Sequence, residues 1–331
     1  MKKIKISLDA MGGDHAPEIV VEGATEAKIR YPDIEFIFFG NKKILYPLID
    51  SKHNLSESEI IHTMEFIKPN DKPSNVIRRG ANTSMALAIK SVKNQSSAMV
   101  SAGNTGALMA FSKLFLKTIS GINRPAIAAC FPTKKGEVCM LDLGANIECD
   151  KNNLIQFALM GQAFAKIVIG IKNPKVSLLN IGEEEIKGLS YIQEASEILK
   201  NLSKIINYCG YVEGDRITDG LVDVIVTDGF TGNIALKTAE GTANFITTEL
   251  KQALTRNLIG KISSLLNYFN LKKFKKRLDP RLYNGAIFIG LDSPVIKSHG
   301  STDYIGFSNS LEVCEKIVRG DLINKIKKNI N

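Results

Sequence analysis

Short apolar runs recur along the chain with helical stretches between them, and several of these runs end in Gly, Asn or Asp. This order is typical of an α/β fold in which helices cover a mostly parallel sheet. Ligands of such sheets bind beyond the carboxyl ends of the strands, so the residues after each strand are the candidate functional residues. Strands are predicted at residues 5–9, 35–39, 98–101, 138–141, 176–180 and 222–227.

Long apolar helical segments are predicted at residues 107–119 and 154–169. The second is apolar on nearly every face, which indicates a buried helix or a helix in a subunit interface. With 44% hydrophobic and 23% charged residues, a chain of 331 residues can bury a large core. We expect one α/β catalytic domain over residues 1–331, with a basic amphipathic helical excursion at about 251–278.

The cysteines and the N-terminal segment bear on the compartment. No segment has the composition of a signal peptide, and no apolar run is long enough to span a membrane. The five cysteines are odd in number and show no Cys-x-x-Cys spacing, so neither a disulfide framework nor a zinc knuckle is indicated. These features predict a cytoplasmic protein whose thiols are reduced.

The net charge of +9 is concentrated in one segment. Eight of the 43 basic residues and none of the 34 acidic residues lie between 251 and 278, so the rest of the chain is nearly neutral. A surface that binds nucleic acid along the whole protein is therefore not indicated, and no nucleic-acid partner is expected.

Two glycine-rich turns follow the strands predicted at residues 5–9 and 98–101. In the first, Gly12 and Gly13 let backbone amides approach a ligand, although a plain tight turn explains the pair about as well. The second turn leads into an apolar helix whose N-terminal amides and dipole favour an anion, and its candidate residues are Gly103, Asn104, Thr105 and Gly106. An ordinary helix cap by Asn104 or Thr105 is the alternative explanation.

Three further turns follow the strands predicted at 138–141, 176–180 and 222–227. Lys187 is the one cation in the middle turn, and a lysine near a strand end is a natural partner for a phosphate dianion. A surface ion pair with Glu183 or Glu184 is the alternative for this lysine. All five turns are expected to outline one polar crevice, to which these three contribute Asn146, Gly182, Thr231, Gly232 and Asn233.

The chain has few other candidate catalytic residues. His15 and His299 lie in glycine-rich turns, where a proton-transfer role competes with a simple hydrogen bond to the loop. Cys139 lies within a predicted strand and is expected in the core, so no acyl-cysteine intermediate is proposed. The chain has no Gly-x-Ser-x-Gly elbow and no metal-ligand cluster, so neither a metal nor another cofactor is expected.

The basic segment has the pattern of an amphipathic helix. Its apolar residues recur at spacings of three and four and are followed by a lysine-rich run. Such a helix binds an anionic bilayer surface, and each lysine contributes on the order of 1 kcal/mol. Packing in a dimer, with the charged end in solvent, is the alternative. The same patch could also dock an acidic protein, and this use is compatible with membrane contact. The residues predicted to contact the membrane are Leu258, Ile262, Leu266, Phe269, Lys272 and Lys273.

Eight stretches of the chain resemble the phosphate acyltransferase family of bacterial phospholipid synthesis. They are LDAMGGDHAP, SAGNTGALM, RPAIAACFPT, LDLGANIECD, LLNIGEEEIKG, VTDGFTGNIALKTAEG, YNGAIFIGL and VIKSHGS, and they run from residue 8 to about 301. The resemblance implies a homodimer with a three-layer α/β/α sandwich fold, related to phosphotransacetylases and isopropylmalate dehydrogenase-like enzymes. The family usually has Arg two residues after Ser84, where this chain has Ala86, so no phosphate-binding role is expected of that helix.

The same resemblance implies that acyl-[acyl carrier protein] and inorganic phosphate are converted to acyl phosphate. The product would pass, beside the membrane, to an integral glycerol-3-phosphate acyltransferase. A thiolate leaves readily, so such an enzyme has to position phosphate, offset its charge and donate hydrogen bonds to the oxyanion. On this hypothesis the turn at 103–106 holds phosphate and Lys187 offsets its charge. Asn233 donates to the oxyanion, with the amides of Thr231 and Gly232.

Three other interpretations remain open. A phosphotransacetylase-like enzyme would use acyl-coenzyme A with the same chemistry. An NAD-dependent dehydrogenase would fit a related scaffold, but no strand is followed by Gly-x-Gly-x-x-Gly. A non-catalytic membrane or nucleic-acid adaptor built around the basic helix would leave the five turns unexplained.

Overall fold

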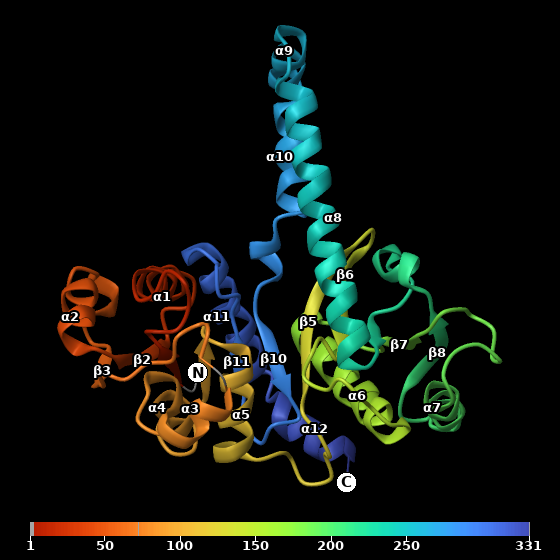
Figure 1. The fold of residues 1–331 in the computed structure, drawn as a ribbon, viewed down its shortest axis with the longest axis horizontal. Helices are drawn as coiled ribbons and strands as arrows, with labels where there is room; N and C mark the ends of the chain where they lie inside the picture. Colours follow the sequence, from red (N-terminus) through yellow and green to blue (C-terminus); the bar gives the residue numbers. More distant parts are fainter. Residues whose placement is uncertain (1–2, 72, 331) are drawn as a thin grey trace.

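The computed structural model describes residues 3–71 and 73–330, which form a sheet of eleven strands with helices packed on it (Figure 1). Side chains are described for all of these residues except 73–75. The strands in chain order are β1 (Ile4–Asp9), β2 (Ile34–Gly40), β3 (Glu59–His62), β4 (Ala98–Ser101), β5 (Ala126–Thr133), β6 (Gly136–Leu141), β7 (Lys175–Leu179), β8 (Asn207–Val212), β9 (Val224–Val226), β10 (Ala286–Ile289) and β11 (Val295–Lys297).

Helices cover both faces of the sheet, which gives three layers. The helices of the described residues are α1 (Glu18–Arg30), α2 (Lys42–Asp50), α3 (Pro73–Arg79), α4 (Ser84–Ser91), α5 (Thr105–Leu116), α6 (Lys151–Phe164), α7 (Ser190–Asn201), α8 (Gly229–Thr255), α9 (Leu258–Leu266), α10 (Tyr268–Arg277), α11 (Tyr304–Arg319) and α12 (Leu322–Ile330).

Alternate residues of β2 enter two separate hydrophobic clusters. Phe36 and Phe38 belong to the cluster on the face covered by α1, whereas Ile37 and Phe39 belong to the cluster on the face covered by α4. The period of two follows from strand geometry, in which successive side chains point to opposite faces. Because both faces are buried, β2 is apolar from Phe36 to Phe39.

The six predicted strands are confirmed within two residues at each end, as are the two predicted helices within three residues at each end once the π-helical turn Ala165–Ile169 after α6 is included. Helix α6 is largely buried, as its composition indicated. The sequence-based prediction missed β3, β5, β8, β10 and β11. Of these, β5 and β10 decide the topology, because they lie side by side at the middle of the sheet.

The strand order is β3-β2-β1-β4-β11-β10-β5-β6-β9-β7-β8. Neighbours are parallel except at β11–β10, β10–β5 and β5–β6. Three reversals make the strands of the second half, from β6 to β8, run opposite to β1–β4. Within the sheet, the turns after β6, β7 and β9 therefore leave from the edge at which β1 and β4 begin. The five turns therefore do not all leave from the same edge of the sheet.

A helical hairpin projects from the body of the molecule (Figure 1). Helix α8 forms its outgoing arm, α9 lies at its tip, and α10 returns toward the sheet. The excursion expected at 251–278 corresponds to the outer part and the returning arm. Among the described residues, no helix is both long and apolar enough to cross a membrane.

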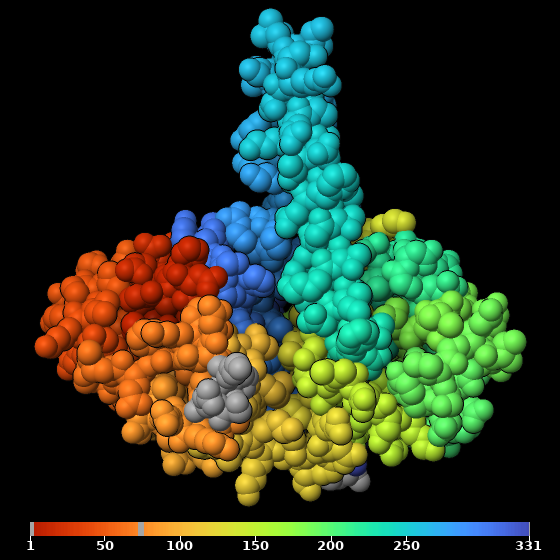
Figure 2. All heavy atoms as spheres, in the orientation of Figure 1, coloured from red at the N-terminus to blue at the C-terminus, as the bar shows by residue number. Residues whose placement is uncertain are grey.

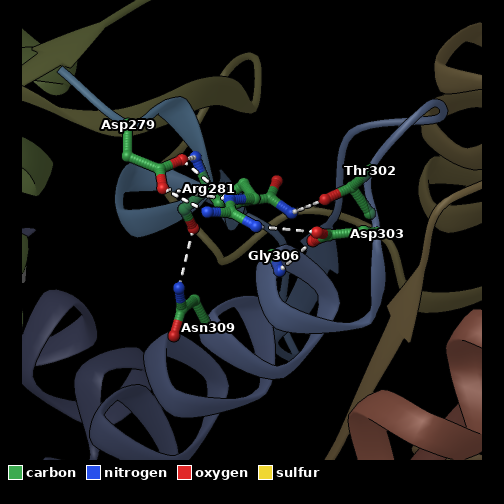
Figure 3. A network of polar contacts seen from close by, with 7 residues as sticks. Asp279, Arg281, Thr302, Asp303, Gly306 and Asn309 are labelled. Atoms are coloured by element: carbon green, nitrogen blue, oxygen red, sulfur yellow. Dashed lines mark hydrogen bonds and ion pairs between the residues drawn. The ribbon is translucent and has the colours of Figure 1, made fainter. Parts of the chain in front are cut away.

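The base of the returning arm is fastened by Arg281 (Figure 3). Its guanidinium binds the Asp279 carboxylate through Nε and Nη2, and Nη1 donates to Asp303 Oδ2 over 2.9 Å. Asp303 in turn caps α11 by accepting from the Gly306 amide, and Asn309 Nδ2 donates to the Arg281 carbonyl. These contacts tie the hairpin to α11, and the guanidinium lowers the pKa of Asp279.

Candidate functional site

A cavity of about 350 Å³ lies where the turns after β1, β4 and β11 meet. At roughly 30 Å³ for one water, it holds about a dozen waters, which is enough for a phosphate and the reacting end of a larger ligand. Its lining consists of Gly13, Asp14, Ile67, Pro69, Ala102, Gly103, Asn104, Thr105, Gly106, Lys297 and Gly300.

Asp9 organises the floor of this region from the end of β1. Its buried carboxylate accepts from Ser84 Oγ over 2.6 Å and from Ser101 Oγ over 2.7 Å. Ser101 Oγ also accepts from the Gly103 amide, which fixes the start of the second turn. Burial raises the pKa of Asp9, and the two hydroxyl hydrogen bonds oppose that shift. Asp9 was not singled out from the sequence, although it opens the first of the glycine-rich turns.

The first two turns touch through their backbones, and this contact requires glycine. A Cβ on Gly12 would lie 2.4 Å from Asp9 Oδ2 and 2.9 Å from the Gly103 nitrogen. Gly13 has φ of +113°, and a Cβ there would lie 2.9 Å from that of Ala102. The structure thus brings together both glycine pairs that the sequence analysis selected, at one wall of the cavity.

The N-terminus of α5 presents two amides without a partner. Asn104 Oδ1 caps the Ala107 amide, and its Nδ2 donates to the carbonyls of Pro69 and Asp71. The side chain of Asn104 is therefore the helix cap that was weighed as an alternative. The amides of Thr105 and Gly106 donate to no acceptor among the described residues. They face the cavity at the positive end of the helix dipole, where an anion is stabilised.

Lys297 completes this wall from the end of β11. Burial lowers the pKa of its ammonium group to about 8, while the carboxylates of Asp14 and Asp9 oppose the shift. Lys297 lies in the segment VIKSHGS, one of the stretches that resemble the family, but no role was predicted for it. A signal was available, since the lysine stands at the end of an apolar run and is followed by a His-Gly pair.

The two candidate histidines occupy different surroundings. His15 is exposed and does not line the cavity. His299 is anchored through its backbone amide, which donates to Asn284 Oδ1 over 2.9 Å. Burial lowers the pKa of His299, and the charges of Glu240, Lys297, Lys237 and Asp14 act on it as well. Glu240 and Lys237 belong to α8, the outgoing arm of the hairpin.

The turn after β6 is organised by buried Asp142. Its Oδ1 accepts from the amides of Ile127, Gly144 and Ala145, and its Oδ2 accepts from the Asn146 amide and side chain. Burial raises the pKa of this carboxyl group. Asn146 Nδ2 also donates to the Pro125 carbonyl over 2.8 Å. Both N–H bonds of the Asn146 side chain are thus used inside the protein rather than offered to a ligand.

In the turn after β9, the hydrogen-bond donors are likewise used inside the protein. Asp228 caps α8 by accepting from the Thr231 amide and hydroxyl, each over 2.8 Å, and its carbonyl accepts from the Gly232 amide. The expectation that these two amides are free for an oxyanion is therefore not met in this structure. Asn233 is exposed, and its Nδ2 donates one bond of 3.3 Å to the Leu143 carbonyl. One N–H bond of Asn233 stays available.

The turn after β7 is held by Asn180, whose Nδ2 donates to the carbonyls of Gly182 and Lys187. Lys187 is exposed, and neither acidic neighbour takes its charge, because Glu183 pairs with Arg216. No ion pair of the described residues includes Lys187. The surface ion pair considered as an alternative is thus absent from the part of the chain that the structure describes.

The candidate residues consequently fall into two groups. Gly12, Gly13 and the 103–106 turn meet at the cavity, whereas the turns after β6, β7 and β9 supply none of its lining. Helix α8 lies between the two halves in Figure 2 and carries Asn233 near its start. Ala86 is buried in the core on α4 and reaches no ligand surface, and the same helix supplies Ser84 to Asp9.

Among residues 3–71 and 73–330, no group of three or more His, Cys, Asp or Glu side chains comes together as a metal site. Cys139 is fully buried, and burial raises its pKa far above the usual range of a thiol.

Comparison with known proteins gives consistent results over the whole chain. A family model described as "Fatty acid synthesis protein" matches residues 4–325. A phosphate acyltransferase of Pelagibacter ubique is 56% identical over 331 residues, with 99% of each chain covered. A phosphate acyltransferase of Parvibaculum lavamentivorans is 49% identical, with 98% of this chain and 90% of the relative covered.

Solved structures support the fold. A phosphotransacetylase from Streptococcus pyogenes superposes with a TM-score of 0.66 at 18% identity, covering 96% of this chain and 94% of the other. A 4-hydroxythreonine-4-phosphate dehydrogenase from Klebsiella pneumoniae gives 0.54 at 14% identity, with 96% and 98% covered. The predicted α/β sandwich class is confirmed by these likenesses and by the mostly parallel sheet. With relatives of this identity over nearly its full length, the chain belongs to the phosphate acyltransferase family.

Proposed function

We propose that this chain transfers an acyl group from acyl-[acyl carrier protein] to inorganic phosphate, which yields acyl phosphate and free carrier protein. The observation that carries the proposal is the cavity of about 350 Å³ that is lined by Lys297 and by Thr105 and Gly106, whose amides are free. Amides at a helix N-terminus together with one cation suit a small tetrahedral anion. The name of the relatives supplies phosphate as the acceptor.

The reaction asks little of an acid or a base. A phosphate oxygen attacks the thioester carbonyl, a C–O bond forms, the C–S bond breaks, and the electron pair leaves with the carrier thiolate. The enzyme positions the two reactants and stabilises the charge that develops on the carbonyl oxygen. In this proposal the cavity binds phosphate, while Lys187 offsets negative charge and the remaining N–H bond of Asn233 reaches the oxyanion. His15 is exposed beside the first turn and is available for proton transfer.

The second-half turns have to approach the cavity for these roles. Sheet twist of roughly 20–25° per strand rotates β9 by about 120–150° relative to β1, which turns opposite edges of a sheet toward each other. A closed arrangement with both substrates bound would bring Asn233 and Lys187 to the phosphate.

The test incubates the protein with palmitoyl carrier protein, with and without phosphate, and measures free carrier thiol. The proposal expects thiol only when phosphate is present, in an amount equal to the acyl phosphate formed. A parallel reaction supplies palmitoyl-coenzyme A. Comparable or faster turnover of the coenzyme A donor would favour the phosphotransacetylase-like alternative, and thiol release without phosphate would contradict acyl transfer to phosphate.

Lys187→Ala tests the second-half contribution in the same assay. Loss of a cation that acts on the transition state is expected to lower kcat by roughly several-fold to a thousandfold, with little change in phosphate binding. Lys200→Ala is the matched control, because its ammonium pairs with Glu185 at the surface. Full activity of Lys187→Ala would remove Lys187 from the reaction.

We propose further that the hairpin rests on the inner face of the cell membrane and that the chain works as a peripheral membrane enzyme. Leu258, Ile262, Leu266 and Phe269 are each at least 53% exposed at the tip, next to Lys272 and Lys273. Apolar side chains beside a one-signed basic flank suit an anionic bilayer surface. There the product would be passed to an integral glycerol-3-phosphate acyltransferase. The acidic carrier protein is a second candidate for the basic flank.

Flotation with vesicles tests the membrane proposal. The protein is expected to float with phosphatidylglycerol vesicles, and Lys272→Glu/Lys273→Glu should weaken this by roughly tenfold or more at low salt. Lys325→Glu/Lys328→Glu on α12 controls for net charge. If the Lys272→Glu/Lys273→Glu variant floats as well as the wild type, electrostatic attraction of the hairpin to the membrane is refuted. Light scattering on the same samples tests the homodimer, the other arrangement that would cover the exposed tip.

A further inference from the structure

Lys297 is the basic residue among the lining residues of the cavity, and the established family assignment gives it no role. It ends β11, which pairs in parallel with β4, so its side chain lies beside the turn that leads into α5. The register places Lys297 opposite Ser101, two residues before Gly103. The strand therefore delivers one ammonium group to the cavity that Thr105 and Gly106 also line.

The ammonium group is only partly satisfied. Its Nζ donates to the Ala102 carbonyl over 3.2 Å and to the carbonyl of Ser298. An ammonium has three N–H bonds, and the third has no acceptor among the described residues. No carboxylate of those residues forms an ion pair with it either. A charged lysine with a spare donor, partly buried and lining a cavity, is poised for an anion that enters from solvent.

Two carboxylates act on Lys297, and further charged groups act on the neighbouring His299. Asp14 lies in the turn after β1, and Asp9 ends that strand, where Ser84 and Ser101 hold its carboxylate. His299 follows on the same loop, and Lys237 and Glu240 of α8 pair with each other over 2.7 Å. Both nearby carboxylates favour the charged lysine, whereas burial disfavours it.

We propose that Lys297 is the phosphate-binding cation of this site, and that its third N–H bond holds a phosphate oxygen jointly with the amides of Thr105 and Gly106. This inference rests on the proposed function and deepens it, because it assigns ground-state binding of phosphate to the first half of the molecule. Lys187, from the second half, then acts on the reaction rather than on binding.

The first test measures phosphate binding alone, by calorimetry or by the rise of Tm with added inorganic phosphate. Lys297→Met keeps most of the length of the side chain and removes the charge, so phosphate should bind about 10–100-fold more weakly. Lys297→Arg keeps the charge and should restore most of the affinity. Lys43→Met, at an exposed lysine of α2, is the matched control. Wild-type affinity in Lys297→Met would overturn the proposal.

The second test uses the intact protein and covers the case in which Lys297→Met does not fold. The charge of sulfate stays constant in this pH range. Its binding should therefore weaken as the pH rises above about 8, the pKa of Lys297 in the protein without ligand. The loss should approach tenfold per pH unit, because the neutral amine loses its attraction for the anion. Lys297→Arg should bind equally at all these pH values. A wild-type profile that is as flat as that of Lys297→Arg would overturn the proposal.

The steady-state arm separates this inference from the proposed reaction. With acyl carrier protein as donor, Lys297→Met should raise the KM for phosphate about as much as it weakens binding, with a smaller change in kcat. If the wild-type protein binds phosphate through Lys297 but transfers no acyl group, the proposed function fails and the binding site stands. If acyl transfer occurs with an unchanged phosphate KM in Lys297→Met, the function stands and the role of Lys297 is refuted.

Discussion

The two halves of the sheet end in turns of similar composition that are used differently. Around the cavity, the amides of Thr105 and Gly106 and one N–H bond of Lys297 have no acceptor among the described residues. In the second half, the carboxylates of Asp142 and Asp228 accept hydrogen bonds from backbone amides of their own turns. A glycine- and asparagine-rich turn after a strand therefore indicates either a ligand site or a self-contained loop, and the position of a carboxylate decides between them.

The largest effect is expected from Asp142→Asn. The new amide group faces donors that now lack a full acceptor, so the free energy of unfolding should fall by roughly 3 kcal/mol or more, measured by urea denaturation. The exposed Asp215→Asn is the control and should stay near wild type. Phosphate binding by the folded fraction should persist, and its loss would show that the two halves form one site already without ligand.

Gly12→Ala tests the close backbone contact at the cavity. The added Cβ would lie 2.4 Å from Asp9 Oδ2, so the first turn has to shift away from Gly103. Phosphate-dependent activity should drop about a hundredfold, or roughly 2.7 kcal/mol. Gly214→Ala is the control, because its Cβ meets nothing within 4 Å. Near-normal activity of Gly12→Ala would mean that this wall does not hold the substrate.

Asn104→Ala separates the helix cap from the ligand role. The cap and the bonds to Pro69 and Asp71 are lost, so stability should fall by about 1 kcal/mol and the KM for phosphate should rise a few-fold. Asn257→Ala removes an equivalent cap from α9, away from the cavity. It should lower stability similarly without changing the KM. Equal KM values in both variants would contradict a role for the Pro69 wall in binding.

The smallest effect is expected from Asp14→Asn. Removal of this carboxylate lowers repulsion of phosphate, so binding near neutral pH should tighten by a few-fold, an effect that added salt removes. The Lys297 pKa loses a contribution that raises it, so the pH at which sulfate binding fades should move down by less than about one unit. Asp50→Asn on α2 is the exposed control. A shift toward higher pH would contradict the proposed surroundings of Lys297.

Much of the architecture was predictable because local patterns determine it. Apolar runs bounded by Gly and Asn located six strands, and the predicted α/β class is confirmed. The strands β10 and β11 were missed although they are no shorter than β4 and β9. Their places in the sheet depend on pairing with β5 and β4, which lie far earlier in the chain. The sequence also predicted that glycines after the strands let backbones approach closely. The contact between Gly12 and Gly103 at one wall of the cavity is such an approach.

The sequence by itself determined the fold class, the family, the glycine-rich turns and the basic amphipathic segment, because each depends on residues close together in the chain. Only the tertiary structure decided which strands run antiparallel, which amides stay free and which lysine reaches the cavity. Those features arise from residues far apart in sequence, such as Asp9 with Ser84 and Lys297 with Ala102. Hydrogen bonds between them form only after the sheet is assembled, so no local pattern records them.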